Sequence, residues 1–195
     1  GTITCGSDSS LSSMAVVSTG ATAIQIANSD GLILANCAVS FDPAVSSFLG
    51  CDIYNSARPK IRDCTFTRGG LQLSRCPDFL IEGNVFDGEY ANNNELIHAS
   101  AKSFGVIMGN TFLNMLEDGI DIFSSGRGDV ITGNRFIGCR SAQAIECKVT
   151  MSDNPANGSG QTLGFVESTM ISNNYFRDFT ATTNGFRCAI FAEYV

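Results

Sequence analysis

Apolar positions recur along the chain in a short motif. The motif reads apolar-x-[Gly/Asp/Asn]-[Asn/Cys]-x-Phe, and its clear copies begin at Ile61, Ile81, Ile107, Ile131 and Ile171, with a weaker copy in residues 33–39. From Cys64, the fourth position recurs after 20, 26, 24 and 40 residues. A period in the low twenties is too short for helical-hairpin repeats and is typical of leucine-rich repeats or of a parallel β-helix.

The residue types favour the β-helix. The leucine-rich pattern L-x-x-L-x-L is missing, and no segment reads as an amphipathic helix. In a β-helix each repeat is one coil, and each position lies above its counterpart in the next coil. We therefore predict a single-stranded parallel β-helix with about 20–26 residues per coil. The Ile and Phe positions should form inward ladders, and the Asn position should form an amide ladder along a turn.

A second strand follows in each coil. It appears as apolar-x-apolar triplets that begin at Leu71, Ile97, Ile120 and Ile145, and a last triplet at residues 189–191 has an open register. Strand alternation points the middle residue of each triplet outward. We expect one domain over residues 1–195, with a protruding loop at about 149–164 where a polar stretch interrupts the repeat.

The outward positions of this second strand carry the candidate chemistry. In successive coils they are Gln72, His98, Asp121 and Glu146, and two residues further on come Ser74, Ser100, Phe123 and Lys148. We expect these polar residues to face solvent, because a buried acid is costly unless it is paired. Asp121 and Glu146 should then lie about 5 Å apart, or more if they splay.

A close acid pair suggests glycoside hydrolysis. Proximity raises one pKa, so one group serves as general acid while the other stays ionised. A separation of about 5 Å suits a retaining mechanism, and roughly 6.5–9.5 Å an inverting one. Asp118 is a further carboxylate source at the start of the same strand, or else a turn-former before Gly119.

Other residues on this face could bind substrate, or could simply be solvated. Phe123 should point outward beside Asp121, where its ring can stack on a sugar. His98, Lys148, Gln72 and Arg127 are the further candidates for substrate contact. The alternative is that the acids are solvated surface groups and that Glu146 pairs with Lys148 to little effect.

Composition excludes several classes. A net charge of −7 argues against nucleic-acid binding, which needs clustered Lys and Arg. No apolar run reaches the roughly 18 residues of a membrane span. None of the eight Cys forms a C-x-x-C pair, and no metal site is expected. Cys37, Cys64, Cys139 and Cys147 lie in apolar strands, which favours free thiols over the alternative of one or more disulfides. Without evident end caps, the chain should continue in the intact protein or be covered by another subunit.

The strands around the acids also resemble a known group. Residues 117–126 read EDGIDIFSSG, residues 130–136 read VITGNRF, and residues 144–148 read AIECK. This order is similar to that in pectin-lyase-like right-handed β-helices, above all bacteriophage tailspikes and polysaccharide depolymerases. The resemblance implies a right-handed coil, a homotrimer in the virion tail that folds in the host cytoplasm, and cleavage of bacterial polysaccharide by outer-face acids. By position, these would be Asp121, Glu146 and Asp118. A secreted protein is the alternative location.

Three functions follow for comparison. The first is an endoglycosidase on bacterial surface polysaccharide, which needs no cofactor. The second is a polysaccharide lyase or epimerase, with Lys148 or His98 as base and Arg or Ca²⁺ to neutralise the substrate acid. The third is a non-catalytic carbohydrate-binding or structural β-helix, in which Asp121→Asn and Glu146→Gln would change no activity.

Overall fold

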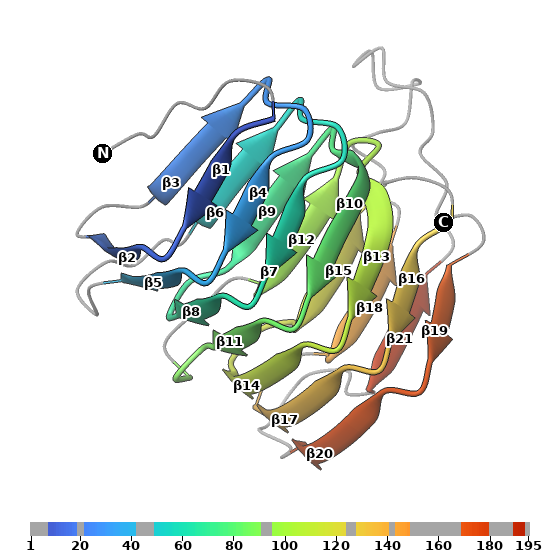
Figure 1. The fold of residues 1–195 in the computed structure, drawn as a ribbon. Helices are drawn as coiled ribbons and strands as arrows, with labels where there is room; N and C mark the ends of the chain where they lie inside the picture. The colour runs from blue at the N-terminus through green and yellow to red at the C-terminus, as the bar shows by residue number, and fades with distance from the viewer. Residues whose placement is uncertain are drawn as a thin grey trace, which may run out of the picture.

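The protein is a solenoid of stacked coils built from three parallel sheets (Figure 1). A computed structural model describes residues 8–18, 22–41, 49–90, 95–123, 128–140, 143–148, 169–179 and 189–193. Within these ranges all regular structure is strand, and no helix is present that is long and apolar enough to cross a membrane. This confirms the predicted all-β parallel coil.

Each sheet takes one strand from each of seven successive coils. Sheet 1 contains β1 (Ser10–Ser12), β4 (Ile33–Ala35), β7 (Lys60–Arg62), β10 (Pro77–Glu82), β13 (Phe104–Met108), β16 (Val130–Thr132) and β19 (Met170–Ser172). Sheet 2 contains β2 (Ala15–Ser18), β5 (Ala38–Phe41), β8 (Thr65–Thr67), β11 (Val85–Asp87), β14 (Thr111–Met115), β17 (Arg135–Cys139) and β20 (Tyr175–Phe179). Sheet 3 contains β3 (Thr22–Ala27), β6 (Leu49–Tyr54), β9 (Leu71–Ser74), β12 (Ile97–Ser100), β15 (Ile120–Phe123), β18 (Ile145–Lys148) and β21 (Ile190–Glu193).

In sheet 1, residues at the same position of the sequence motif pair with one another in successive coils. Ile61 pairs with Ile81, Ile81 with Ile107, and Ile107 with Ile131. In the weaker copy Leu34, not Ile33, takes the first position, and its spacing of 27 residues to Ile61 slightly exceeds the expected range. Ile131 pairs with Ile171 across 40 residues, which is one coil plus an insertion. The loop expected at 149–164 lies outside the described residues.

The predicted apolar ladders fill the interior. The Phe rings of sheet 2 stack face to face from coil to coil. Successive centroids lie 4.8, 5.1, 4.6 and 5.2 Å apart through Phe66, Phe86, Phe112, Phe136 and Phe176. Inward positions of sheet 3, such as Ile120 and Ile122, are fully buried in the same core. The outer faces of the sheets are therefore left for polar chemistry.

The predicted amide ladder follows the turn between sheets 1 and 2. The backbone N–H of Asn110 donates to Oδ1 of Asn134 in the next coil at 2.9 Å, and its side-chain Nδ2 donates to the Ile81 carbonyl of the preceding coil at 3.0 Å. Asn84 and Asn134 repeat both bonds. The side-chain amide of Asn110 also accepts from the backbone N–H of Asn84, so each buried amide satisfies one backbone N–H and one carbonyl of the preceding coil.

The backbone conformation at the third motif position explains why the residue there is Gly, Asp or Asn. Its residues all have a positive φ, between 53° and 66°. They are Asn36, Asp63, Gly83, Gly109, Gly133 and Asn173. Left-handed backbone is strained for most L-residues but accessible to Gly, Asn and Asp. The turn conformation therefore selects the residue types that made the repeat visible.

The described cysteines are buried free thiols. They are Cys37, Cys51, Cys64, Cys76, Cys139 and Cys147. Burial raises the pKa of Cys64 and Cys76 to about 11 and that of Cys147 to about 12. These groups stay protonated near neutral pH and pack as small apolar side chains, as the sequence predicted.

Candidate functional site

The outward positions of sheet 3 form a single column of stacked residues, which we call the outer column. It contains Gln25, Asp52, Gln72, His98, Asp121 and Glu146, each paired with the next. In β21, Phe191 pairs with Glu146 and so supplies the register that the sequence left open. The expected neighbouring column of Ser74, Ser100, Phe123 and Lys148 is also in register.

The expectation that Asp121 and Glu146 face solvent is wrong. Their residues are only 1% and 9% exposed. Ile120 and Ile122 on either side of Asp121 occupy the core, so the carboxylate lies on the outer side of the sheet, as alternation requires. It is covered there by its neighbours: Nδ1 of His98 contacts Oδ2 of Asp121 at 3.2 Å. The acids are therefore outward on the strand but shielded from water.

Asp118 is the most perturbed acid of the site. It is 5% exposed, and its Oδ1 accepts a 2.8 Å hydrogen bond from the backbone N–H of Gln143 in the next coil. Burial raises the pKa of Asp118 to about 8, against the lowering effect of the Gln143 N–H. The charge of Glu146, a side-chain hydrogen bond to it and the charge of Asp121 raise this pKa further.

The hydrogen-bonded acid pair is Asp118 with Glu146, whereas the sequence suggested Asp121 with Glu146. Two carboxyl groups can form a hydrogen bond only if one of them carries a proton. Glu146 thus helps to keep the proton on Asp118, and Asp121 is a further carboxyl group whose charge acts on the same residue. We call these three residues the carboxyl cluster.

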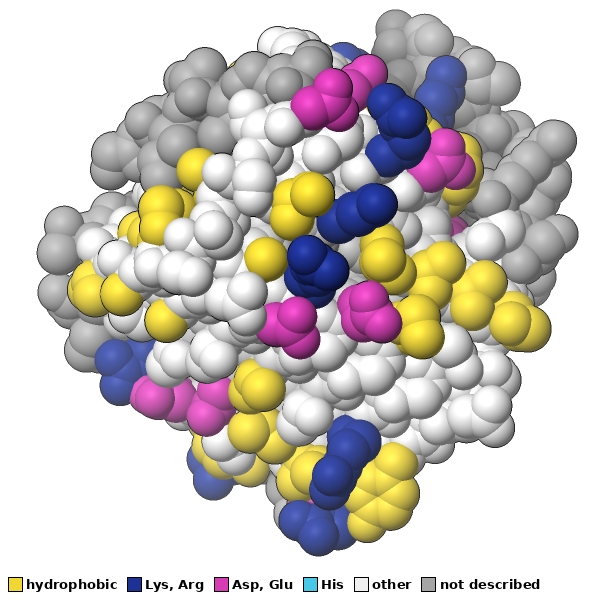
Figure 2. All heavy atoms as spheres, viewed as in Figure 1, with side chains coloured by type: hydrophobic (Ala, Val, Ile, Leu, Met, Phe, Trp, Pro, Cys, Tyr) yellow, Lys and Arg dark blue, Asp and Glu magenta, His cyan; other side chains and the backbone are white. Residues whose placement is uncertain are grey.

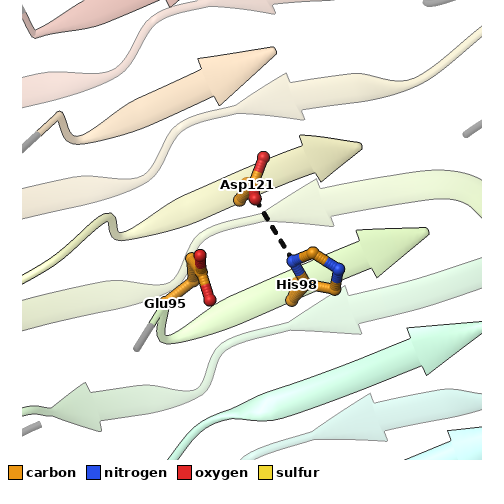
Figure 3. A group of neighbouring side chains, drawn as sticks. All are labelled: Glu95, His98 and Asp121. Carbon is orange, nitrogen blue, oxygen red and sulfur yellow. Dashed lines mark ion pairs between the residues drawn. The ribbon is translucent and has the colours of Figure 1, made fainter. Parts of the chain in front are cut away.

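Glu95 is a site residue that the sequence reading missed. One carboxylate oxygen of Glu95, a nitrogen of His98 and a carboxylate oxygen of Asp121 all lie within 4.8 Å of one another. Figure 3 shows Glu95 at the start of β12, beside His98 and facing Asp121 of the next coil. The sequence did contain a signal for Glu95. Glu95 stands two residues before Ile97, and Asp118 stands two residues before Ile120, which is the register partner of Ile97.

The remaining candidates are only partly placed. Gln72 is half-buried one coil before His98, and the half-buried Phe123 ring lies 5.7 Å from the His98 ring, centroid to centroid. The backbone of Lys148 pairs with Phe123, but its side chain lies outside the described part of the structure. Arg127 is also outside the described residues. Among these candidates, the structure therefore places Gln72 and Phe123 next to His98.

The right-handed β-helix family model matches residues 2–157, which is most of the chain. The chain belongs to the right-handed β-helix family. A search of curated proteins and a search of solved structures each gave no significant match. The handedness that the resemblance implied thus agrees with the family match, and the β-helix fold is consistent with proteins that act on polysaccharides.

Proposed function

We propose that this β-helix protein binds and hydrolyses a bacterial surface polysaccharide at the carboxyl cluster of sheet 3. The observation that carries the proposal is the burial of Asp118, which raises its pKa to about 8 and so keeps it protonated among the carboxyl groups of Asp121 and Glu146. Glycoside hydrolysis requires one protonated and one ionised carboxyl group in the same site. The resemblance to tailspikes and depolymerases supplies the substrate class.

Each acid then has a distinct role. Asp118, with a pKa of about 8, holds a proton at neutral pH and donates it to the departing glycosidic oxygen. The charge of Glu146 and a side-chain hydrogen bond to it help to raise the Asp118 pKa. Asp121 acts as nucleophile or as base toward water, with His98 in contact to orient it. Phe123 offers a ring on which a sugar can stack.

The charge of the site favours hydrolysis over elimination. A lyase acts beside a uronic carboxylate, whose charge must be neutralised by a cation. In the described part of the site, Glu95 and Asp121 lie beside His98, and the charges of Asp121 and Glu146 act on Asp118. This excess of acids repels an acidic sugar and favours a neutral backbone.

A digestion assay on capsular, O-antigen and exopolysaccharide preparations tests the proposal. We expect new reducing ends with the wild type, and a loss of at least about 100-fold in kcat for Asp118→Asn and Asp121→Asn, the scale of general acid–base catalysis. Glu82→Gln, which removes an exposed acid from sheet 1, is the matched control and should stay active. Unsaturated, ultraviolet-absorbing products would identify a lyase instead, and unchanged cleavage by both Asn variants would refute the site.

We also propose that the protein works as a homotrimer in a virion tail, as the resemblance suggests. The outer face of sheet 1 supports an assembly role, because its stacked positions Leu80, Val106, Val130 and Met170 are apolar. Met170 is 52% exposed. Figure 2 looks onto this face and shows apolar side chains gathered beside basic and acidic ones. Light scattering after size exclusion should give three times the mass of one chain; a monomer that is unaltered by Met170→Lys would refute the trimer.

A further inference from the structure

Glu95, His98 and Asp121 bring three metal-ligating groups together on the outer face of sheet 3. Glu95 and His98 belong to one coil and Asp121 to the next, so the stacking of the coils creates the group. Their ligand atoms lie within 4.8 Å of one another (Figure 3). Asp121 thus belongs both to the carboxyl cluster and to this second group of side chains.

The spacing suits a small cation. Ligands at about 2.0–2.2 Å from a tetrahedral Zn²⁺ are separated by about 3.3–3.6 Å. Nδ1 of His98 and Oδ2 of Asp121 are 3.2 Å apart, which is close to that ligand–ligand distance. Glu95 is half-buried and needs only a shift of about 1.5 Å or less at its carboxylate to complete the same arrangement.

The burial and charge of the site point to a bound cation. Asp121 is 1% exposed, and a buried carboxylate is stable only when it is paired or coordinates a metal. His98 supplies at most one positive charge, whereas Glu95 and Asp121 bring two negative charges. A divalent ion would neutralise both carboxylates.

We infer that Glu95, His98 and Asp121 bind one divalent transition-metal ion, with Zn²⁺ as the expected ion. An imidazole with two carboxylates suits Zn²⁺ or Mn²⁺, whereas Ca²⁺ takes oxygen ligands only. Three protein ligands leave at least one position for water or a sugar oxygen. A bound ion would change the role of Asp121 in hydrolysis from direct contact with the sugar to holding a cation-bound water.

The only histidine of the chain makes the test specific. The untagged protein, freed of metal with a chelator, is titrated with Zn²⁺ while the imidazole signals are followed by NMR and the heat is measured by calorimetry. We expect the His98 signals to move and to saturate at one equivalent. Binding to a cysteine thiol would leave these signals in place, so the readout separates the two kinds of ligand.

Conservative variants test the individual ligands. We expect Glu95→Gln and Asp121→Asn to weaken Zn²⁺ binding by about tenfold or more, and His98→Gln to abolish it. Gln72→Ala is the matched control, because Gln72 occupies the same column one coil earlier. Glu95→Gln is the deciding variant, because Glu95 is half-buried and its replacement disturbs the core less than a change at the buried Asp121.

Three outcomes would overturn the inference. They are imidazole signals that stay unchanged at saturating Zn²⁺, wild-type affinity in Glu95→Gln, and equal binding of Ca²⁺ by the wild type and His98→Gln. The first outcome would identify His98 and Asp121 as an ion pair only. The measurement uses no polysaccharide, so its failure would leave the proposed hydrolysis intact, and an inactive protein would leave the metal site intact.

Discussion

Asp129 carries a buried charge that lowers stability at neutral pH. The residue is 1% exposed, and its Oδ1 accepts a 3.0 Å hydrogen bond from the backbone N–H of Gly105 in the preceding coil. Within the described part of the chain, its Oδ2 has no hydrogen-bond partner. Burial raises the Asp129 pKa from 3.8 to about 6, although the Gly105 N–H opposes the shift.

The magnitude of the effect follows from that shift. A folded-state pKa that is raised by about two units costs about 3 kcal/mol once the group is ionised in both states. The cost is absent below about pH 4, grows between about pH 4 and 6, and is complete above about pH 6. Asp129→Asn keeps the oxygen that accepts from Gly105 and removes the charge. We therefore expect it to raise the free energy of unfolding by about 1–3 kcal/mol at pH 8, since the new amide N–H groups must also find partners.

Urea unfolding at about pH 4 and pH 8 measures the effect. Asp63→Asn is the control, because Asp63 is exposed and its left-handed backbone accepts Asn equally well. We expect a gain for Asp129→Asn at the higher pH only, and little change for the control at either pH. A gain of equal size at both pH values, or a loss at pH 8, would refute the assignment of the cost to a buried charge.

Three further predictions concern the ladders and the acids. Asn110→Ala removes two ladder bonds to backbone groups and should lower the free energy of unfolding by about 2–4 kcal/mol in urea, whereas a neutral result would contradict the ladder. Gly109→Ala, at a φ of 65°, should cost about 1–2 kcal/mol and Gly109→Asn clearly less; equal costs would show that the turn tolerates any residue. The rate of hydrolysis should decline as pH rises through about 8, where Asp118 loses its proton. Glu146→Gln should move this decline of kcat to lower pH, because it removes one cause of the raised Asp118 pKa. A decline that stays at the same pH in Glu146→Gln would exclude Asp118 as the acid.

The sequence was informative where one position stacks on its equivalent. Phe112 lies between Phe86 and Phe136, and Asn110 lies between Asn84 and Asn134, so a repeated residue type reports directly on a repeated contact. The same logic placed Asp121 in register with Glu146. The column was therefore predictable from alternation and coil length alone.

The environment of the acids was not predictable in the same way. Burial of Asp121 depends on which side chains lean over it, and the contact between Asp118 and Glu146 joins residues that are not register partners. Glu95 was missed because it precedes its strand and repeats no motif residue. Such contacts depend on rotamers and on the path of the chain between strands, which a repeat pattern does not encode.

The two ladders do not extend through all of the described coils, and this makes the early coils unlike the later ones. The ring stack begins at Phe66, where earlier coils have Val39 and Val16, and the amides begin at Asn84, where earlier coils have Cys64 and Cys37. The first coils therefore have smaller side chains and weaker thiol contacts in place of rings and amides. Backbone amides near the amino-terminal end should exchange with solvent first, while β12, β15 and β18 stay protected and hold the acids in a fixed geometry.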